Sequence, residues 1–358
     1  MYDIAIIGAG PAGSTLARLI GNKYKVLLIE KRNLTASQEK ASAVKCCGGL
    51  LAPDAQMLLS KMGLGLPKNV LVEPQLFVVR AIDAQRNLEK YYQRYYINMN
   101  RQNFDRWLLS MVPSNVDVRL GSTFKSYERE KDSFKIEFFD SSNTYIDQTK
   151  ILIGADGASS LVYKQSASKN HSSRLYFAIQ EWVEADNTKL PYFSTLFDSE
   201  ITDYYCWTIP KGKHLIIGAA LNPNDKAPGK FLLLKEKLED YGLKFGKATK
   251  REGAFIRRPV SIRQLTTGTK GIALLGEAGG WISPSSAEGI SYAFRSALIL
   301  ATVLNKSTEN FEKRYRKRTK RLSRNIFSKN LKSHFIFNSF LRKFSMKSGF
   351  QSMNLYKP

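Results

Sequence analysis

At 358 residues the chain is long enough for two lobes with substantial cores, and 43% hydrophobic and 11% aromatic residues are ordinary for a globular protein. It has no apolar run of about 18 residues, and its first strand is predicted to start at Tyr2, leaving no room for a signal peptide, so we expect a cytoplasmic protein. Cys46, Cys47 and Cys206 lack metal-ligand spacing and indicate neither a disulfide framework nor a zinc site. The net charge of +24 is extreme, and residues 306–358 hold fifteen Lys or Arg against two Glu.

The first thirty residues predict a strand, a glycine loop, a helix and a second strand. Residues 2–7 and 25–30 are apolar runs of strand length, and residues 14–21 have helical spacing. Between the first strand and the helix lies the loop Gly8-Ala9-Gly10-Pro11-Ala12-Gly13. A lone GxGxxG also fits an ordinary turn, but this order of elements indicates a dinucleotide-binding βαβ unit.

Each position in this loop has a physical reason. Gly8 permits the tight turn, Gly10 leaves room for a pyrophosphate, and Gly13 lets the helix pack closely on the strand. Pro11 suits a first-turn position, which needs no N–H donor. Glu30, at the tip of the second strand, is expected to accept hydrogen bonds from an adenosine ribose and to repel a 2′-phosphate, which favours FAD or NAD over NADP.

Two segments after this unit have more than one interpretation. Cys47, Gly48 and Gly49 follow Lys45 in a loop that either approaches a ligand closely or simply buries its thiols. A helix is predicted over residues 100–111. Its first turn contains Arg101, whose charge opposes the helix dipole, so an anionic partner and plain solvent exposure are both open.

The middle of the chain is rich in strands. Strands are predicted over 75–81, 91–98, 116–119, 122–129, 134–139 and 151–153, and a glycine turn with Asp156 and Gly157 follows the last of these. From about 165 to 262 the pattern is β-rich and aromatic, with one helix over 231–241. Tyr205, Trp207 and Pro210 there fit either a good core or the wall of an apolar pocket.

A third glycine turn follows a buried strand at 272–275. Gly276 and Glu277 stand at the carboxyl end of that strand, where ligands bind in open α/β sheets. A helix is predicted over 285–304, after Pro284, with its first N–H groups free near Ser286 to bind an anion.

With these three loops, the chain resembles the FAD-dependent oxidoreductases of the p-hydroxybenzoate hydroxylase fold. The Lys45–Leu50 and Tyr205–Pro210 segments are similar to motifs of the geranylgeranyl reductase branch, and residues 48–56, 96–105 and 288–293 resemble the CbrA-type flavoproteins. The cofactor-binding residues that this resemblance implies are Gly8, Gly10, Pro11, Ala12, Gly13, Glu30, Lys31, Lys45, Cys47, Gly48, Gly49, Arg101, Asp156, Gly157, Gly276, Glu277, Gly289 and Ile290.

The resemblance implies an α/β fold in which a Rossmann-like FAD-binding domain is interleaved with a β-rich substrate domain. The implied bounds are 1–72, 100–164 and 263–305 for the FAD-binding domain, 73–99 and 165–262 for the substrate domain, and 306–358 for a basic helical C-terminal region. Tyr205, Trp207, Pro210 and Pro284 are the implied substrate residues.

The resemblance also implies a reaction. Reduced FAD is expected to transfer hydride to a double bond of a polyprenyl or other apolar substrate, with Cys47 as the candidate catalytic residue and NAD(P)H or a ferredoxin-like carrier as the reductant. A flavin-dependent monooxygenase and a flavin-containing binding protein for a polyprenyl carrier are the alternatives. Glu277 and Tyr163 depart from the family pattern, which more often has Asp and Arg at these positions, and Cys46 replaces a common proline.

The basic C-terminal region has two interpretations. It binds an anionic membrane surface, as a peripheral protein at the inner face of the membrane, or it packs across the FAD-binding domain with a solvated basic side. Two apolar sets fall near helical spacing, namely Phe311, Tyr315, Leu322, Ile326 and Phe327, then Phe335, Ile336, Phe337, Phe340, Leu341 and Phe344. No nucleic-acid recognition motif accompanies the charge, and we expect a monomer that binds no nucleic acid.

Overall fold

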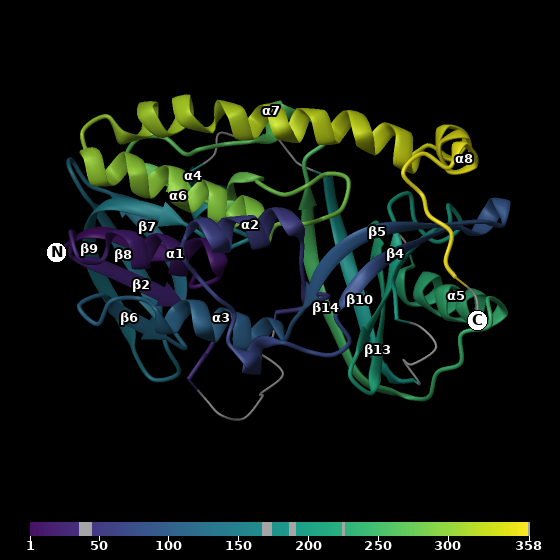
Figure 1. Ribbon diagram of the computed structural model, residues 1–358. Coiled ribbons are helices and arrows are strands. Elements are labelled where there is room, and N and C mark those ends of the chain that lie inside the picture. The colour runs from purple at the N-terminus through teal and green to yellow at the C-terminus, as the bar shows by residue number, and fades with distance from the viewer. Residues whose placement is uncertain (36–44, 167–173, 186–190, 224–225, 357–358) are drawn as a thin grey trace. The chain divides into compact units, whose positions relative to one another are not determined.

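The computed structural model describes residues 1–35, 45–166, 174–185, 191–223 and 226–356 (Figure 1). The chain forms two compact units, each built from three segments. Unit 1 comprises Met1–Val44, Gln102–Arg174 and Arg257–Lys329, and unit 2 comprises Lys45–Arg101, Leu175–Ile256 and Asn330–Pro358. The packing thus assigns residues 45–72 to unit 2 and divides the C-terminal region between the units, unlike the expected domain bounds. A functional division of the chain stays a prediction, because the units are defined by packing alone.

Unit 1 contains a seven-stranded sheet among the described residues, in the order β6-β2-β1-β9-β8-β7, with β15 paired to the end of β9. The pairs among β6, β2, β1, β9 and β15 are parallel, whereas β7, β8 and β9 form an antiparallel meander. The strands are β1 (Tyr2–Ile7), β2 (Val26–Glu30), β6 (Asp117–Leu120), β7 (Thr123–Arg129), β8 (Phe134–Phe139), β9 (Thr144–Gly154) and β15 (Ile272–Leu274). The helices are α1 (Pro11–Ile20), α3 (Arg101–Ser110), α4 (Leu161–Ser166), α6 (Ile290–Lys306) and α7 (Phe311–Phe337), the last of which ends in unit 2.

Both faces of this parallel sheet are buried, which explains why its strands are almost wholly apolar. Side chains alternate along a strand, so Ile4 and Ile6 pack with α1 and α6, whereas Ala5 and Ile7 pack with residues of the β7–β8 meander. Packing on both faces therefore fixes the carboxyl ends of the strands, from which the glycine loops leave the sheet.

Unit 2 contains an eight-stranded sheet among the described residues, in the order β14-β10-β13-β12-β11-β4-β5-β3. Its strands are β3 (Leu50–Leu51), β4 (Leu76–Asp83), β5 (Leu88–Asn98), β10 (Arg174–Glu184), β11 (Phe193–Phe197), β12 (Cys206–Lys211), β13 (His214–Leu221) and β14 (Ala248–Arg258). The helices are α2 (Pro53–Lys61), α5 (Ala227–Asp240) and α8 (Ser339–Ser348). The predicted α/β class, with a Rossmann-like sheet, a second β-rich sheet and a helical C-terminal region, is confirmed.

The two faces of the unit 2 sheet have different neighbours. On one face Cys206, Ile217 and Ala219 pack with the apolar side of α5. Because side chains alternate, Tyr205 and Trp207 lie on the opposite face, where Tyr205 stacks on Phe337 near the end of α7. Tyr205 and Trp207 therefore share the face that α5 does not cover, whereas Pro210, which pairs with Leu215, lies on the α5 side.

The predicted helix start at residue 285 is wrong. Helix α6 begins at Ile290, and Ala287 before it has a positive φ of 50°, which no helix continues through. Glu288 accepts hydrogen bonds from the backbone N–H and the hydroxyl of Ser291, at 2.7 and 2.6 Å. Glu288, the residue before the N-cap Gly289, thus takes the N–H of Ser291 in the first turn, and the free N–H groups that we expected near Ser286 are not those of a helix.

Candidate functional site

Three glycine loops of unit 1 meet at the carboxyl edge of its parallel strands. The Gly8 loop follows β1, Asp156 and Gly157 follow β9, and Gly276 opens the turn after β15. The loops contact one another, because a Cβ on Gly8 would lie 2.6 Å from the carbonyl oxygen of Ala155, and one on Gly276 would lie 3.5 Å from Ala12. The predicted loops are therefore assembled at the position where open α/β sheets bind ligands.

The glycines of the first loop serve different purposes. Gly8 has a φ of +101°, and a Cβ on Gly13 would lie 1.8 Å from the carbonyl oxygen of Gly8, so both are needed for the turn and its packing. Gly10 has an extended conformation that any residue can adopt, and a Cβ there would meet nothing within 4 Å. Pro11 occupies the first turn of α1, and no described side chain caps this helix. The space over Gly10 and the uncapped helix end fit a pyrophosphate.

Asp156 has one free oxygen. Its Oδ2 accepts hydrogen bonds from the backbone N–H groups of Leu161 and Val162, at 2.8 and 3.4 Å, at the start of α4. Its Oδ1 is buried without a partner among the described residues. Burial raises the pKa of this carboxyl, although its hydrogen bonds oppose the shift. An orphaned oxygen beside Gly8 is what a bound ligand, or a water in its place, would satisfy.

Glu30 is held by a neighbour that the sequence did not point to. Its two oxygens accept hydrogen bonds from Ala9 N at 2.8 Å and from the backbone and guanidinium of Arg32 at 2.9 to 3.1 Å. Arg32 also donates to Asp105 at 2.7 Å, and all three side chains are buried. Burial alone would raise the pKa of Glu30, but Arg32 outweighs it and holds the pKa below its usual value. With its four acceptor positions occupied, Glu30 must exchange one bond to contact a ribose.

A second unexpected arginine stands beside Glu277. Oε1 of Glu277 accepts a hydrogen bond from the backbone N–H of Arg257 at 2.9 Å, and the Arg257 guanidinium lies 3.7 Å from the centre of the Tyr163 ring. We expected Tyr163 to lose the positive charge that an arginine supplies at this position. The end of β14 brings a buried arginine to it instead.

The remaining predicted residues of unit 1 have simpler surroundings. Gly289 and Ile290 form the start of α6, where a Cβ on Gly289 would make only ordinary contact with Ile282. Pro284 is buried, and its carbonyl oxygen accepts a hydrogen bond from Arg258 at 2.9 Å. Lys31 is exposed. None of these positions has a geometry that requires a ligand.

In unit 2, the Cys47 loop packs on the sheet face that α5 does not cover. The sulfur of Cys47 accepts hydrogen bonds from Gly49 N and Arg101 Nη1, both at 3.4 Å, so Arg101 is not merely solvated. A Cβ on Gly48 would lie 2.5 Å from the end of Ile209. The loop, Arg101 and β12 thus lie together in unit 2, and the approach of a ligand to this loop stays a prediction. Lys45 is exposed.

Lys211 holds this loop by hydrogen bonds to its backbone, and no pattern in the sequence pointed to this residue. Its Nζ donates hydrogen bonds to the carbonyl oxygens of Gly49 at 2.9 Å and Met99 at 2.8 Å. The side chain is buried, and this burial lowers its pKa from 10.5 to about 7, against an opposing contribution from Cys47. A neutral amine has two N–H groups, which match the two carbonyls.

Replacement of Lys211 by methionine should remove a pH dependence of stability. Between pH 7 and 10.5 the unfolded chain holds a proton on Lys211 that the folded chain lacks. The free energy of unfolding therefore rises with pH, by at most about 1.4 kcal/mol per unit. Urea unfolding at pH 7, 8 and 9 should show this slope in the wild type and in the control Lys213→Met, an exposed lysine, but not in Lys211→Met. Equal slopes in all three proteins would contradict the assignment.

Of the predicted substrate residues, Tyr205 and Trp207 form part of a mainly apolar face, and Pro210 lies on the other side of the sheet. The indole of Trp207 lies flat over Gly218, where a Cβ would be 2.2 Å from the ring. Nε1 of Trp207 and Oε1 of Gln180 are buried without partners among the described residues, and both residues pair with Gly218 across the strands. Pro210 is also buried and accepts a hydrogen bond from Asn98 at 2.7 Å.

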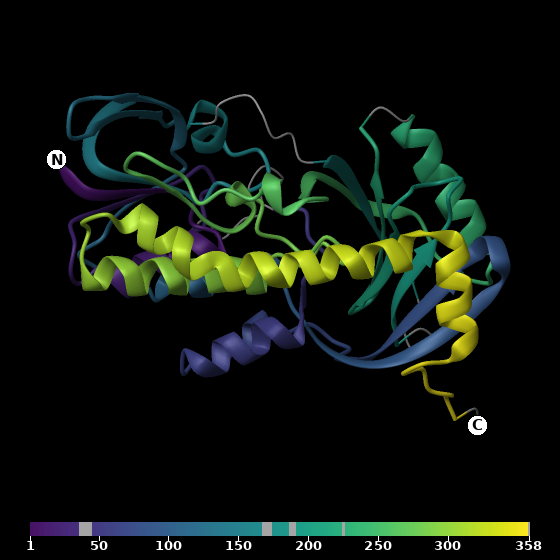
Figure 2. The same cartoon turned by 90° about the horizontal axis from the view of Figure 1, so that it is seen from above.

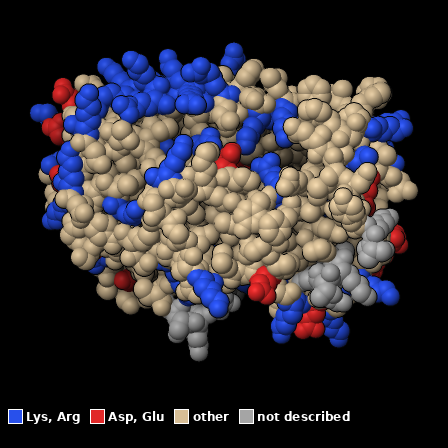
Figure 3. Space-filling model, viewed as in Figure 1, with Lys and Arg blue, Asp and Glu red and all other residues tan. Residues whose placement is uncertain are grey.

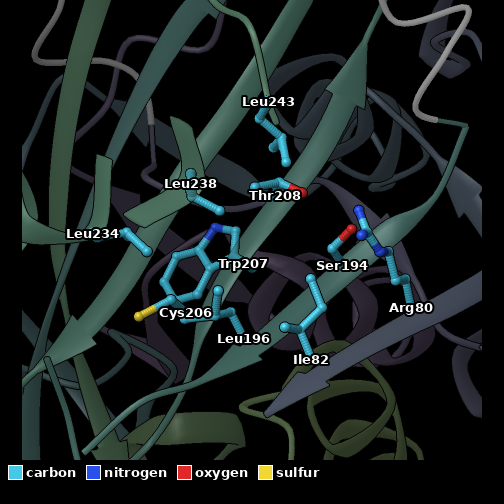
Figure 4. Close-up of a pocket in the computed structure, with 10 residues that line it drawn as sticks. All are labelled: Arg80, Ile82, Ser194, Leu196, Cys206, Trp207, Thr208, Leu234, Leu238 and Leu243. Carbon is cyan, nitrogen blue, oxygen red and sulfur yellow. The ribbon is translucent and has the colours of Figure 1, made fainter. Parts of the chain in front are cut away.

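A cavity in unit 2 lies where β4, β11 and β12 meet α5 (Figure 4). Its volume is about 10 Å³, room for about one water molecule, so it is a packing gap and no substrate site. Its lining residues are Arg80, Ile82, Ser194, Leu196, Cys206, Trp207, Thr208, Leu234, Leu238 and Leu243.

Known proteins with similar sequences show the family to which this chain belongs. Residues 1–192 match the family described as FAD binding domain. The chain is 40% identical over 348 residues to protein CbrA of Escherichia coli O6:H1, covering 97% of this chain and 93% of that protein. CbrA of Shigella sonnei is also 40% identical, with 97% of both chains covered. The chain belongs to this family of FAD-dependent oxidoreductases.

Solved structures show the same fold for this flavoprotein. A geranylgeranyl bacteriochlorophyll reductase-like protein of Thermoplasma acidophilum superposes with a TM-score of 0.80 at 21% identity, over 96% of this chain and 90% of that one. PqsL of Pseudomonas aeruginosa, described as a probable FAD-dependent monooxygenase, has a TM-score of 0.70 at 15% identity, over 98% and 99%.

The residues of unit 1 fit FAD. Three features suit the phosphates and the polar chain of a dinucleotide. They are the open space over Gly10, the uncapped start of α1 and the unpartnered Oδ1 of Asp156. FAD is therefore the cofactor, and these groups are the ones in unit 1 that we expect to hold it.

Proposed function

We propose that this flavoprotein reduces a carbon–carbon double bond in a polyprenyl or similarly apolar substrate. The observation that carries the proposal is the packing of the Cys47–Gly49 loop on the apolar face of β12, where Gly48 touches Ile209 and Trp207 lies over Gly218. The fold neighbour named as geranylgeranyl reductase-like, with its TM-score of 0.80, supports this choice.

The face also carries a pair of polar atoms that suits one substrate group. Trp207 Nε1 is a donor and Gln180 Oε1 an acceptor, and both are buried without partners among the described residues. A hydroxyl accepts from the first and donates to the second. An apolar chain with a hydroxyl is therefore a better match to this face than a pure hydrocarbon.

Cys47 has a definite task in this reaction. When bound, FAD supplies the hydride. A hydride added to one alkene carbon needs a proton at the other, and the thiol of Cys47 gives up its Sγ proton and regains one from water. Arg101 and Gly49 fix the position of the sulfur by their hydrogen bonds. The apolar face excludes water from the alkene.

Replacement of Cys47 by alanine should lower the rate of double-bond reduction by roughly 100-fold or more, because the proton donor is lost. FAD content and substrate affinity should stay within about twofold, since an alanine adds no bulk. Stopped-flow reoxidation of the flavin and equilibrium titration measure these quantities. The control is Cys46→Ala, because burial raises the pKa of that neighbouring thiol and keeps it inert. Unchanged turnover in Cys47→Ala would refute the assignment.

The reaction itself is tested without oxygen. The bound flavin is reduced with dithionite and mixed with geranylgeraniol, and flavin absorbance and product mass are followed. We expect reoxidation together with a gain of two hydrogens per reduced bond. A product that gains oxygen, and only when air is admitted, would instead establish a monooxygenase, the activity named for PqsL. No product under either condition would favour a flavin-containing binding protein. The natural reductant then follows from comparing NADH, NADPH and a reduced ferredoxin.

A further inference from the structure

The first part of α7 has a buried side and a basic side. Phe311 and Tyr315 belong to the main core of unit 1, and Leu322 and Ile326 pack against Trp281. These apolar residues are therefore part of the fold of unit 1.

The opposite side of this part of α7 is exposed and almost purely cationic. Figure 3 shows Lys and Arg gathered over α7. We call this stretch the basic surface. Its exposed members are Lys313, Arg316, Lys317, Arg318, Lys320, Arg321 and Arg324.

The chain then continues into unit 2 with an exposed apolar stretch, which we call the aromatic surface. It covers the end of α7, α8 and the turn after it (Figure 2). Its members are Leu331, Phe335, Phe340, Phe344 and Phe350, which are between 51% and 74% exposed. Such a series of exposed large apolar side chains marks an interaction surface.

The fold fixes α8 so that its phenylalanines point outward. Arg342 is buried and donates a hydrogen bond to the buried Asp83 at 2.8 Å, and Met346 packs with Ala81 and Phe197. Residues 340 and 344 lie on the other side of the helix from 342 and 346. The exposure of Phe340 and Phe344 is therefore built into unit 2.

We infer that an anionic lipid bilayer is the partner of each surface taken by itself, the basic surface through the headgroups and the aromatic surface through the acyl boundary. A basic stretch gives electrostatic attraction to anionic lipids, and exposed phenylalanines gain free energy by insertion. Nucleic acid would match the charge but not the phenylalanines. No helix in the described residues is both long and apolar enough to cross a membrane, so the contact is peripheral. The inference does not depend on the reaction proposed above.

Vesicle sedimentation tests this inference with the full-length holoprotein. We expect binding to vesicles of phosphatidylcholine with about 30 mol% phosphatidylglycerol, and weak binding to pure phosphatidylcholine. Added salt should weaken binding, because it screens the headgroup charge. Absence of binding to the anionic vesicles at low salt would overturn the proposal.

Substitutions separate the two surfaces. The variant Lys313→Gln/Lys317→Gln/Lys320→Gln/Arg324→Gln should lose roughly 100-fold or more in vesicle partitioning. Its control is Lys131→Gln/Lys164→Gln/Lys213→Gln/Lys247→Gln, which neutralises four exposed lysines elsewhere. Partitioning that falls equally in both variants would show attraction to net charge alone and would refute a specific surface.

The aromatic surface has its own pair of variants. Phe340→Ser/Phe344→Ser should lower partitioning by roughly tenfold or more, whereas Phe77→Ser/Phe255→Ser, at two other exposed phenylalanines of unit 2, should not. FAD content confirms that each variant is folded. If sedimentation velocity shows a dimer that Phe340→Ser/Phe344→Ser abolishes, and vesicles bind both proteins equally, a second copy covers this surface and the lipid proposal fails.

Discussion

A Gly10→Val variant should fold normally and fail to bind FAD. The Gly10 backbone is extended, and a side chain there would meet no protein atom within 4 Å. We expect the free energy of unfolding of the apoprotein to change by no more than about 1 kcal/mol. FAD affinity should fall by roughly 100-fold or more, because the side chain takes the space of the pyrophosphate. Urea unfolding and calorimetric titration with FAD measure the two effects.

Gly13→Ala is the matched comparison at the other end of the loop. Its Cβ would lie 1.8 Å from the carbonyl oxygen of Gly8, so the loop and α1 must move apart. This variant should lose stability even without FAD, by several kcal/mol, roughly the cost of overpacking a core. If Gly10→Val keeps full FAD affinity, the pyrophosphate does not lie over Gly10 and the site has to be placed elsewhere.

Removal of Arg32 should be the most destabilising single substitution outside the hydrophobic core. Arg32→Met leaves the carboxylates of Glu30 and Asp105 buried without their cation. Loss of one partner from a buried ion pair costs about 3 to 5 kcal/mol. We expect a loss of this order in the free energy of unfolding, measured by urea titration of the apoprotein at pH 7.

Arg119→Met is the control, because it removes the same side chain from an exposed ion pair. Arg119 and Asp117 are 43% and 33% exposed, and pairs of that kind contribute at most about 1 kcal/mol. Similar losses in both variants would mean that the Arg32 network is as solvated as a surface pair, contrary to its burial in unit 1.

The features that could be predicted from the sequence are those that a local pattern of neighbouring residues specifies. The strand at 2–7, its glycine loop and the strand ending at Glu30 were recognisable because each is specified by a local pattern. The start of α6 was predicted five residues too early, because the left-handed backbone at Ala287 and the hydrogen bond from Ser291 to Glu288 leave no local sequence pattern. Lys211 could not be found from its own surroundings, because its partners are the carbonyls of Gly49 and Met99, far away in the chain.

The C-terminal region shows a different limit of sequence reasoning. Phe311, Tyr315, Leu322 and Ile326 have the same spacing and chemistry as the later phenylalanines, so a pattern cannot separate those that are core from those that are exposed. Only the positions of Trp281 and of α6 decide that the first set is internal. The glycine loops of the candidate site were predicted, because such loops have sequence motifs. The buried cations that hold these loops, Arg32, Arg257 and Lys211, were not predicted, because no motif marks them.

The buried side of α7 also determines how the protein tolerates shortening. A chain that ended at residue 305 would uncover Trp281, Tyr292 and the outer side of α6, and the bare apolar area would favour aggregation. The buried side of the first part of α7 is thus an internal part of unit 1, although it comes late in the sequence. The outward charges of α7, by contrast, can change sign or number without cost to the interior, so solubility and isoelectric point are free to vary while the cofactor domain stays intact.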